Sequence, residues 1–235
     1  MTNYFTNDKM SDKDLHDARA LDDVNFSDVH DRETLELSHK WLCRNPDLYT
    51  VLRDEDGRLV GYINFMPLKL DAYEKYRKGQ LSETDITADD IARYEDFEID
   101  GDMAGQELDA LFCSLNIAKE HHNGRAFKVL MISFIEKIRE RQNRGVKFGR
   151  VLADCVSEDG KRLVGRLGVT LPYQSHTEGA VLKEIIMDDI LAKYANFIIN
   201  QPVQETDERG RTKKALDYCR GFVIARLCNL RIIRR

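Results

Sequence analysis

The segment from Asp109 to Ile138 constrains the fold more than any other part of this 235-residue chain. It opens with DALFCSLNI, a mostly apolar run that predicts a strand buried on both faces. A short polar loop containing Gly124 follows. Apolar residues then recur at the intervals of an amphipathic helix, at Phe127, Leu130, Met131, Phe134, Ile135 and Ile138. A buried strand that runs into such a helix predicts a layered protein with helices packed on a sheet.

The rest of the chain fits this architecture. The N-terminal residues, up to about Pro46, predict helix that ends at Asn45-Pro46. From Leu48 to Met66, two strand-like runs flank Asp54-Glu55-Asp56-Gly57, which favours a tight hairpin turn. We then expect a helical insertion over 70–106, with a capping box at Thr87 and Asp90. Two further strands are expected at 150–156 and 180–188. Each is followed by a predicted helix: the first is capped by Ser157 and closed by Gly168, and the second is capped by Asp189.

This order predicts an α/β protein with a mixed sheet. We expect one domain over 1–200, a polar linker over 201–214 and a basic segment over 215–235. The basic segment mixes apolar and basic residues. It could dock on the acidic front within the protein or in a homodimer, touch a partner, or meet nucleic acid.

Charge is unevenly distributed along the chain. Residues 71–109 hold thirteen acidic and four basic side chains, and residues 209–235 hold one acidic and nine basic. The whole chain has a net charge of -5, so steering toward nucleic acid or an anionic membrane is not expected. The acidic insertion is either a solvated face or a rim that attracts a cationic substrate.

Composition and missing motifs narrow the class of protein. The sequence shows no signal-peptide pattern and no apolar run near the ~18 residues of a membrane helix. Its five cysteines form no CxxC, which favours reduced thiols in the cytoplasm. His121-His122 lacks a Cys or His partner at zinc spacing, so we expect no metal site. GxxxxGK[ST], HExxH and GxSxG are absent, which disfavours kinases, zincins and α/β-hydrolases.

The loop before Phe127 is the candidate binding site. The start of a helix offers unpaired backbone N–H groups and the positive end of the helix dipole, which together bind anions such as a pyrophosphate. Gly124 permits close approach of a ligand, Ala126 is small, and Arg125 can add a charge-assisted hydrogen bond.

At this loop the chain resembles the GCN5-related N-acetyltransferase (GNAT) superfamily. The family's acetyl-CoA loop has the pattern Gln/Arg-x-x-Gly-x-Gly/Ala. His121-x-x-Gly124-x-Ala126 matches its last two anchors and departs at the first. Ser157 to Val169 is similar to the family's segment that ends in a Leu-Gly-Phe-like turn, and the hairpin at 48–66 matches its second and third strands. The resemblance spans about residues 15–190 and implies a mixed, mostly antiparallel central sheet flanked by helices, the acyl-CoA N-acyltransferase-like fold.

The resemblance also implies a reaction. Acetyl-CoA would lie with its pyrophosphate on the N–H groups of Asn123 to Phe127, with Ser157 on the neighbouring segment. Its pantetheine would pair with the strand edge at Leu115, Asn116 and Ile117. A backbone N–H near Cys113 to Leu115 would hold the thioester oxygen. A primary amine of a small molecule or peptide would attack the acetyl group directly, and the acidic insertion would favour a cationic amine.

Proton transfer needs further residues. An amine with a pKa of roughly 10.4 is protonated at neutral pH, so a carboxylate base is needed. Asp109 is the first candidate and Glu107 the second. The alternative role for Asp109, as a strand-end residue that makes backbone contacts, is the commoner one for a lone carboxylate in this position. The tyrosine that often acts as general acid in this family corresponds to Val164 here. Tyr173, His176 or water would therefore have to protonate the leaving thiolate. The alternatives are a non-catalytic acyl-CoA-binding regulatory module and a protein-interaction adaptor with the same fold.

Overall fold

A computed structural model describes residues 3–7, 9–26, 34–165, 167–172 and 179–199. The chain divides into two compact units, residues 1–190 and 191–235. The first unit contains the sheet and is described below. The predicted linker (201–214) and basic segment (215–235) lie outside the described residues.

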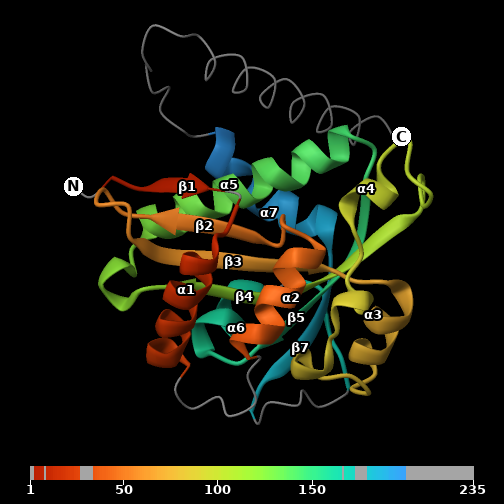
Figure 1. Ribbon diagram of the computed structural model, residues 1–235, viewed down its shortest axis with the longest axis horizontal. Helices are drawn as coiled ribbons and strands as arrows, with labels where there is room; N and C mark the ends of the chain where they lie inside the picture. Colours follow the sequence, from red (N-terminus) through yellow and green to blue (C-terminus); the bar gives the residue numbers. More distant parts are fainter. Residues whose placement is uncertain (1–2, 8, 27–33, 166, 173–178, 200–235) are drawn as a thin grey trace, which may run out of the picture. The chain divides into compact units, whose positions relative to one another are not determined.

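The first unit is built on a seven-stranded sheet in the order β1-β2-β3-β4-β5-β7-β6 (Figure 1). Within the described ranges, β4 and β5 form the one parallel pair, and the other neighbours are antiparallel. The predicted mixed, mostly antiparallel sheet is therefore confirmed. The strands are β1 (Phe5–Asn7), β2 (Tyr49–Arg53), β3 (Leu59–Pro67), β4 (Glu107–Ile117), β5 (Lys147–Cys155), β6 (Val169–Thr170) and β7 (Val181–Ile186).

The predicted hairpin is formed by β2 and β3. The carboxylate of Asp54 accepts hydrogen bonds from the backbone N–H groups of Asp56 (3.0 Å) and Arg58 (2.9 Å). Gly57 has a φ of 78°, which a residue with a side chain rarely adopts. Asp54 and Gly57 thus fix the turn, and the turn fixes the strand register.

Helices cover both faces of the sheet. Neighbouring strand residues point to opposite faces, and Phe65 and Met66 of β3 show this. Met66 joins the core cluster that holds Trp41 of α2 (Leu35–Arg44) and residues of α1 (Asp12–Asn25). Phe65 instead packs against Phe134 of α5 (Gly124–Asn143), with ring centroids 5.2 Å apart. α1 and α2 therefore lie on one face and α5 on the other (Figure 1).

The first part of the predicted helical insertion packs onto the face that carries α1 and α2, whereas its end packs against Phe148 of β5 and Arg141 of α5 through Tyr94. The insertion contains α3 (Leu70–Arg77), α4 (Tyr94–Phe97) and two short 3-10 turns, the second of which starts with the predicted Thr87 and Asp90 capping box. The indole Nε1 of Trp41 donates to the carbonyl of Ile86 (2.8 Å), which ties α2 to the insertion.

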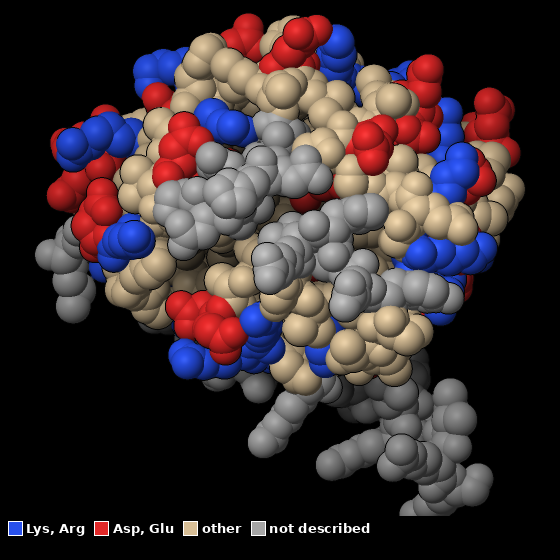
Figure 2. Space-filling view, turned by 90° about the horizontal axis from the view of Figure 1, so that it is seen from below, with Lys and Arg blue, Asp and Glu red and all other residues tan. Residues whose placement is uncertain are grey.

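Some acidic side chains of the insertion form ion pairs with bases. Lys75 lies 2.6 Å from Asp71, and Arg150 lies 3.0 Å from Glu74. On the face seen in Figure 2, Asp and Glu accordingly alternate with Lys and Arg.

Short elements depart from the sequence prediction. β1 and β6 were not expected, because three and two residues are too few to show an alternating pattern. α6 (Glu158–Val164) ends at Gly165, earlier than the expected Gly168. α7 (Met187–Ile199) begins before the expected cap Asp189, because it follows β7 without a loop. No helix within the described ranges combines the length and apolar character of a membrane span.

We expect Trp41→Ala to lower the free energy of unfolding by about 3–5 kcal/mol. The substitution empties a fully buried site and leaves the Ile86 carbonyl without its donor. Urea unfolding followed by circular dichroism measures the loss. Leu70→Ala is the control, because Leu70 is 66% exposed and should cost less than about 0.5 kcal/mol. Equal losses would contradict this account of the core.

Candidate functional site

The site begins where the two parallel strands separate. The pairing of β4 with β5 ends at Phe112 and Ala153, and β4 then continues to Ile117 paired with β3 only. A strand that pairs on one side only presents backbone N–H and C=O groups on the other. The opened edge, Cys113 to Ile117, can therefore accept an extended, amide-containing ligand as an added strand. At its far end the carbonyl oxygen of Ile117 already accepts a hydrogen bond from Asn25 Nδ2 (3.0 Å) and lies 2.6 Å from His122 Nε2, so a ligand would have to displace these groups to pair there.

A bulge lies at the start of the opened edge. Phe112 pairs with Phe65 and Ser114 pairs with Asn64, so Cys113 is an extra residue between two consecutive pairs. Bulges bend a strand and redirect its backbone groups, and they are common beside binding sites. Cys113, Ser114 and Leu115 are half-buried, so the edge is accessible at this point. These are the residues predicted to hold a thioester oxygen.

The start of α5 lies just beyond the opened edge. Gly124 is the first helical residue, and an added Cβ there would meet no protein atom within 4 Å. The amide oxygen of Asn123 accepts hydrogen bonds from the backbone N–H groups of Arg125 (3.1 Å) and Ala126 (2.9 Å). Two of the N–H groups predicted to bind phosphate are thus capped by a side chain, which a ligand anion would have to displace.

The chain's N-terminal segment also contacts this loop, which was not predicted. The hydroxyl of Tyr4 lies 3.1 Å from His121 Nδ1 and accepts a hydrogen bond from Asn123 Nδ2 (3.0 Å). Arg125 donates to the side chain of Asn3 (3.4 Å). A separation of more than a hundred residues leaves no local pattern from which these contacts could have been found.

The second helix start lies after β5. Ser157 is the N-cap of α6, as predicted, and its hydroxyl accepts from the N–H of Gly160 (3.0 Å). The two diverging parallel strands are therefore each followed by a helix start. In open sheets this arrangement marks the usual ligand crevice. Val164 is the last residue of α6, and Tyr173 and His176 lie outside the described residues.

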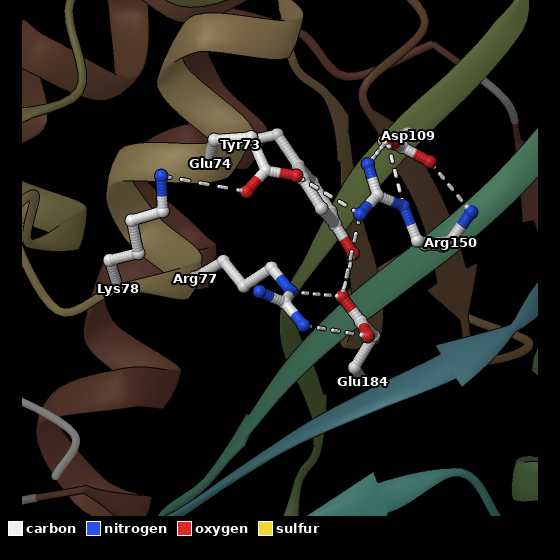
Figure 3. A network of polar contacts seen from close by, with 7 residues as sticks. All are labelled: Tyr73, Glu74, Arg77, Lys78, Asp109, Arg150 and Glu184. Atoms are coloured by element: carbon white, nitrogen blue, oxygen red, sulfur yellow. Dashed lines mark hydrogen bonds and ion pairs between the residues drawn. The ribbon is translucent and has the colours of Figure 1, made fainter. Parts of the chain in front are cut away.

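The candidate base Asp109 is held in a network of charges (Figure 3). Its Oδ1 accepts the backbone N–H of Arg150 (2.7 Å), and its Oδ2 accepts from Arg150 Nη2 (2.5 Å). A Cβ atom added at Gly149 would lie only 2.8 Å from Asp109 Oδ1, so only glycine fits at position 149 without a shift of its neighbours. Glu107, the second candidate, is exposed at the start of β4.

The network joins the insertion to three strands. Arg150 of β5 also binds Glu74 of α3 (3.0 Å) and lies over the ring of Tyr73 (4.6 Å from its centroid). Glu184 of β7 accepts hydrogen bonds from Tyr73 (3.0 Å) and Arg77 (2.6 Å) (Figure 3). Three carboxylates thus share two guanidinium groups on the face that α3 covers.

Burial and charge shift the pKa values of this network. Desolvation raises the pKa of the Tyr73 phenol, and the neighbouring carboxylates of Glu184 and Asp109 raise it further. Desolvation also raises the pKa of Glu184, but hydrogen bonds from Arg77 and Tyr73 outweigh it, so the net pKa is lowered. Glu184 is therefore ionised at neutral pH.

Solved structures with a similar fold exist. The loading GNATL domain of CurA from Lyngbya majuscula has a TM-score of 0.53 and 15% sequence identity, over 80% of this chain and 99% of that domain. Ard1 from Thermoplasma volcanium has a TM-score of 0.49 and 14% identity, over 78% of this chain and 97% of that protein. The sequence matches no protein-family model and no curated protein. The likeness to the CurA domain shows that this chain has the GNAT, acyl-CoA N-acyltransferase-like fold that the sequence resemblance predicted.

We expect Glu184→Gln to remove a pH-dependent part of the stability. Because the folded-state pKa of Glu184 is lowered, its contribution is complete above the unfolded pKa of about 4.3 and disappears as pH falls through the folded-state pKa. The variant should lose about 1.5 kcal/mol or more at pH 7. In urea titrations, the difference in the free energy of unfolding between the variant and the parent should shrink from pH 5 to pH 3. A difference that does not change with pH would contradict the ion pair.

Proposed function

We propose that this chain is an acetyl-CoA-dependent N-acetyltransferase that acts on a primary amine of a small molecule or peptide. The single observation that supports this function best is the opened edge of β4 beside the start of α5, in a chain with the GNAT fold. Backbone groups for an extended arm and a helix start for an anion follow each other along one segment, Cys113 to Phe127. That order suits a ligand with a diamide arm attached to a pyrophosphate.

Acetyl-CoA fits the residues of this segment. Its pantetheine would pair with Leu115 to Ile117, and its pyrophosphate would replace the Asn123 amide oxygen at the N–H groups of Arg125 and Ala126. The empty space around Gly124 allows that approach. When bound, the coenzyme supplies an activated acetyl thioester.

The chain's own groups would assist direct transfer. The amine nitrogen attacks the carbonyl carbon, the N–C bond forms and the C–S bond breaks, and the thiolate takes a proton from solvent or from Tyr173. A backbone N–H at the Cys113 bulge would stabilise the oxygen as negative charge develops. A positioned amide in a partly buried site is already aligned with this charge.

Asp109 would accept the amine's proton through water. In the structure its carboxylate is paired with Arg150, so it must be released first. Two other carboxylates lie close to Arg150: its Nη1 is 3.0 Å from Glu74 and 3.9 Å from Glu184. The guanidinium can therefore remain paired while Asp109 acts.

A non-catalytic acyl-CoA-binding module is the second candidate. Two observations favour it. Val164 occupies the position at which the GNAT superfamily often has its general-acid tyrosine, and the carboxylate of Asp109 is paired with Arg150. Calorimetry with acetyl-CoA and a thiol-release assay with a panel of primary amines separate the two functions. Binding without thiol release for any amine would favour the module, and absence of binding would exclude both.

We expect Gly124→Ala to weaken acetyl-CoA binding by about tenfold or more. The added methyl group meets no protein atom, so the free energy of unfolding should stay the same or rise. Calorimetry gives the affinity and urea unfolding gives the stability. Unchanged affinity would show that no ligand approaches the backbone at this residue.

We expect Asp109→Asn to lower kcat by about 10²- to 10⁴-fold. Acetyl-CoA affinity should not change, since Asp109 lies at the opposite end of β4 from the coenzyme loop. Glu184→Gln is the control, because it loosens the same network without removing the proposed base. If both variants reduce kcat equally, Asp109 has a structural role only.

A further inference from the structure

Two residues that precede β1 bind side chains of the loop proposed to hold the coenzyme. The hydroxyl of Tyr4 accepts a hydrogen bond from Asn123 Nδ2 (3.0 Å) and lies 3.1 Å from His121 Nδ1. Arg125, which was predicted to add a charge-assisted hydrogen bond to the phosphate, donates instead to Asn3 Oδ1 (3.4 Å). The segment before β1 therefore occupies polar groups that the proposed ligand needs.

The contact with Tyr4 also fixes the direction of the Asn123 amide. Because its Nδ2 is donated to Tyr4, the opposite end of the amide, Oδ1, points at the start of α5. There it accepts hydrogen bonds from the backbone N–H groups of Arg125 (3.1 Å) and Ala126 (2.9 Å). Each backbone N–H has one hydrogen to donate, so it binds either Asn123 or a phosphate of a ligand.

Pairing with β2 brings Tyr4 to this loop. Phe5 and Thr6 of β1 pair with Arg53 and Leu52 of β2, and β1 contacts α5 (Figure 1). β1 has three residues and lies at the end of the strand order, so few backbone hydrogen bonds hold it. Short elements of this kind open locally at a lower cost in free energy than core strands.

The contact lies at the surface of the first unit. Asn123, Gly124 and Arg125 are exposed, and Tyr4 is half-buried. Exposed hydrogen bonds can break and re-form without unfolding the sheet. The start of α5 can thus exchange between a closed form, in which Asn123 caps the helix, and an open form with free N–H groups.

We propose that Tyr4 and Asn123 form an autoinhibitory latch, which holds the start of α5 in the closed form and competes with acetyl-CoA for the N–H groups of Arg125 and Ala126. This inference rests on the proposed function. Acetyl-CoA binds the open form, so its apparent affinity is reduced by the fraction of molecules that are open. Binding of the coenzyme and release of Tyr4 are therefore linked.

Tyr4→Phe tests the latch, because it removes the hydroxyl and keeps the ring that contacts His121 edge-on. The loss of one hydrogen bond should raise the open fraction, so calorimetry should show an acetyl-CoA affinity about fivefold higher than that of the parent. Thr6→Ala is the matched control, since Thr6 is exposed on the same segment and pairs with Leu52, and it should leave the affinity unchanged. An unchanged or lower affinity in Tyr4→Phe would overturn the proposal.

Asn123→Gly separates the latch from a direct effect of Tyr4 on the ligand. Glycine costs little as an N-cap, so α5 should still form, while the amide that covers the N–H groups is lost. The acetyl-CoA affinity should rise as it does in Tyr4→Phe. Adding Tyr4→Phe to Asn123→Gly should then have no further effect, because the hydroxyl has lost the group that it holds. A second fivefold rise in the double variant would show that Tyr4 acts by another route and that the latch is wrong.

Hydrogen exchange without acetyl-CoA reads the latch independently of binding. Measured by NMR, the N–H groups of Arg125 and Ala126 should exchange about fivefold faster in Tyr4→Phe than in the parent. The N–H of Gly160, which is capped by Ser157, is the internal control and should not change. Equal exchange in the two proteins would mean that Tyr4 does not hold the cap, and the proposal fails. If acetyl-CoA binds neither protein but exchange follows this pattern, the proposed function fails and the closed form held by Tyr4 stands.

Discussion

The parallel pairing of β4 with β5, and its end at Phe112 and Ala153, is the constraint on which the rest of the site depends. Each backbone group of a strand needs a partner, so separation of two strands within a sheet leaves an edge that a ligand can complete. Because both strands run in the same direction, the helices that follow them start at the same end. The opened edge and the start of α5 therefore lie at the same end of these strands, an arrangement that would suit a coenzyme with an amide arm and a pyrophosphate.

The insertion between β3 and β4 is fixed to this frame by charge. Arg150 of β5 is shared by Asp109 and Glu74, and Glu184 is held by Arg77 and Tyr73. These contacts join α3 to β4, β5 and β7 on one face. The same network restrains the candidate base, so the proposed proton transfer would compete with the ion pair to Arg150 for one carboxylate.

The sequence alone determined the local elements. The hairpin with Asp54 and Gly57, the buried strand that runs into α5, and the Ser157 cap follow from patterns within a few residues, and the fold class follows from their order. The tertiary structure alone decided where β4 and β5 separate, that Tyr4 reaches Asn123, and that Arg150 is shared by acids from different elements. These features join residues that are far apart in the chain. They depend on packing and on the pairing of buried charges, which no short pattern in a single sequence records.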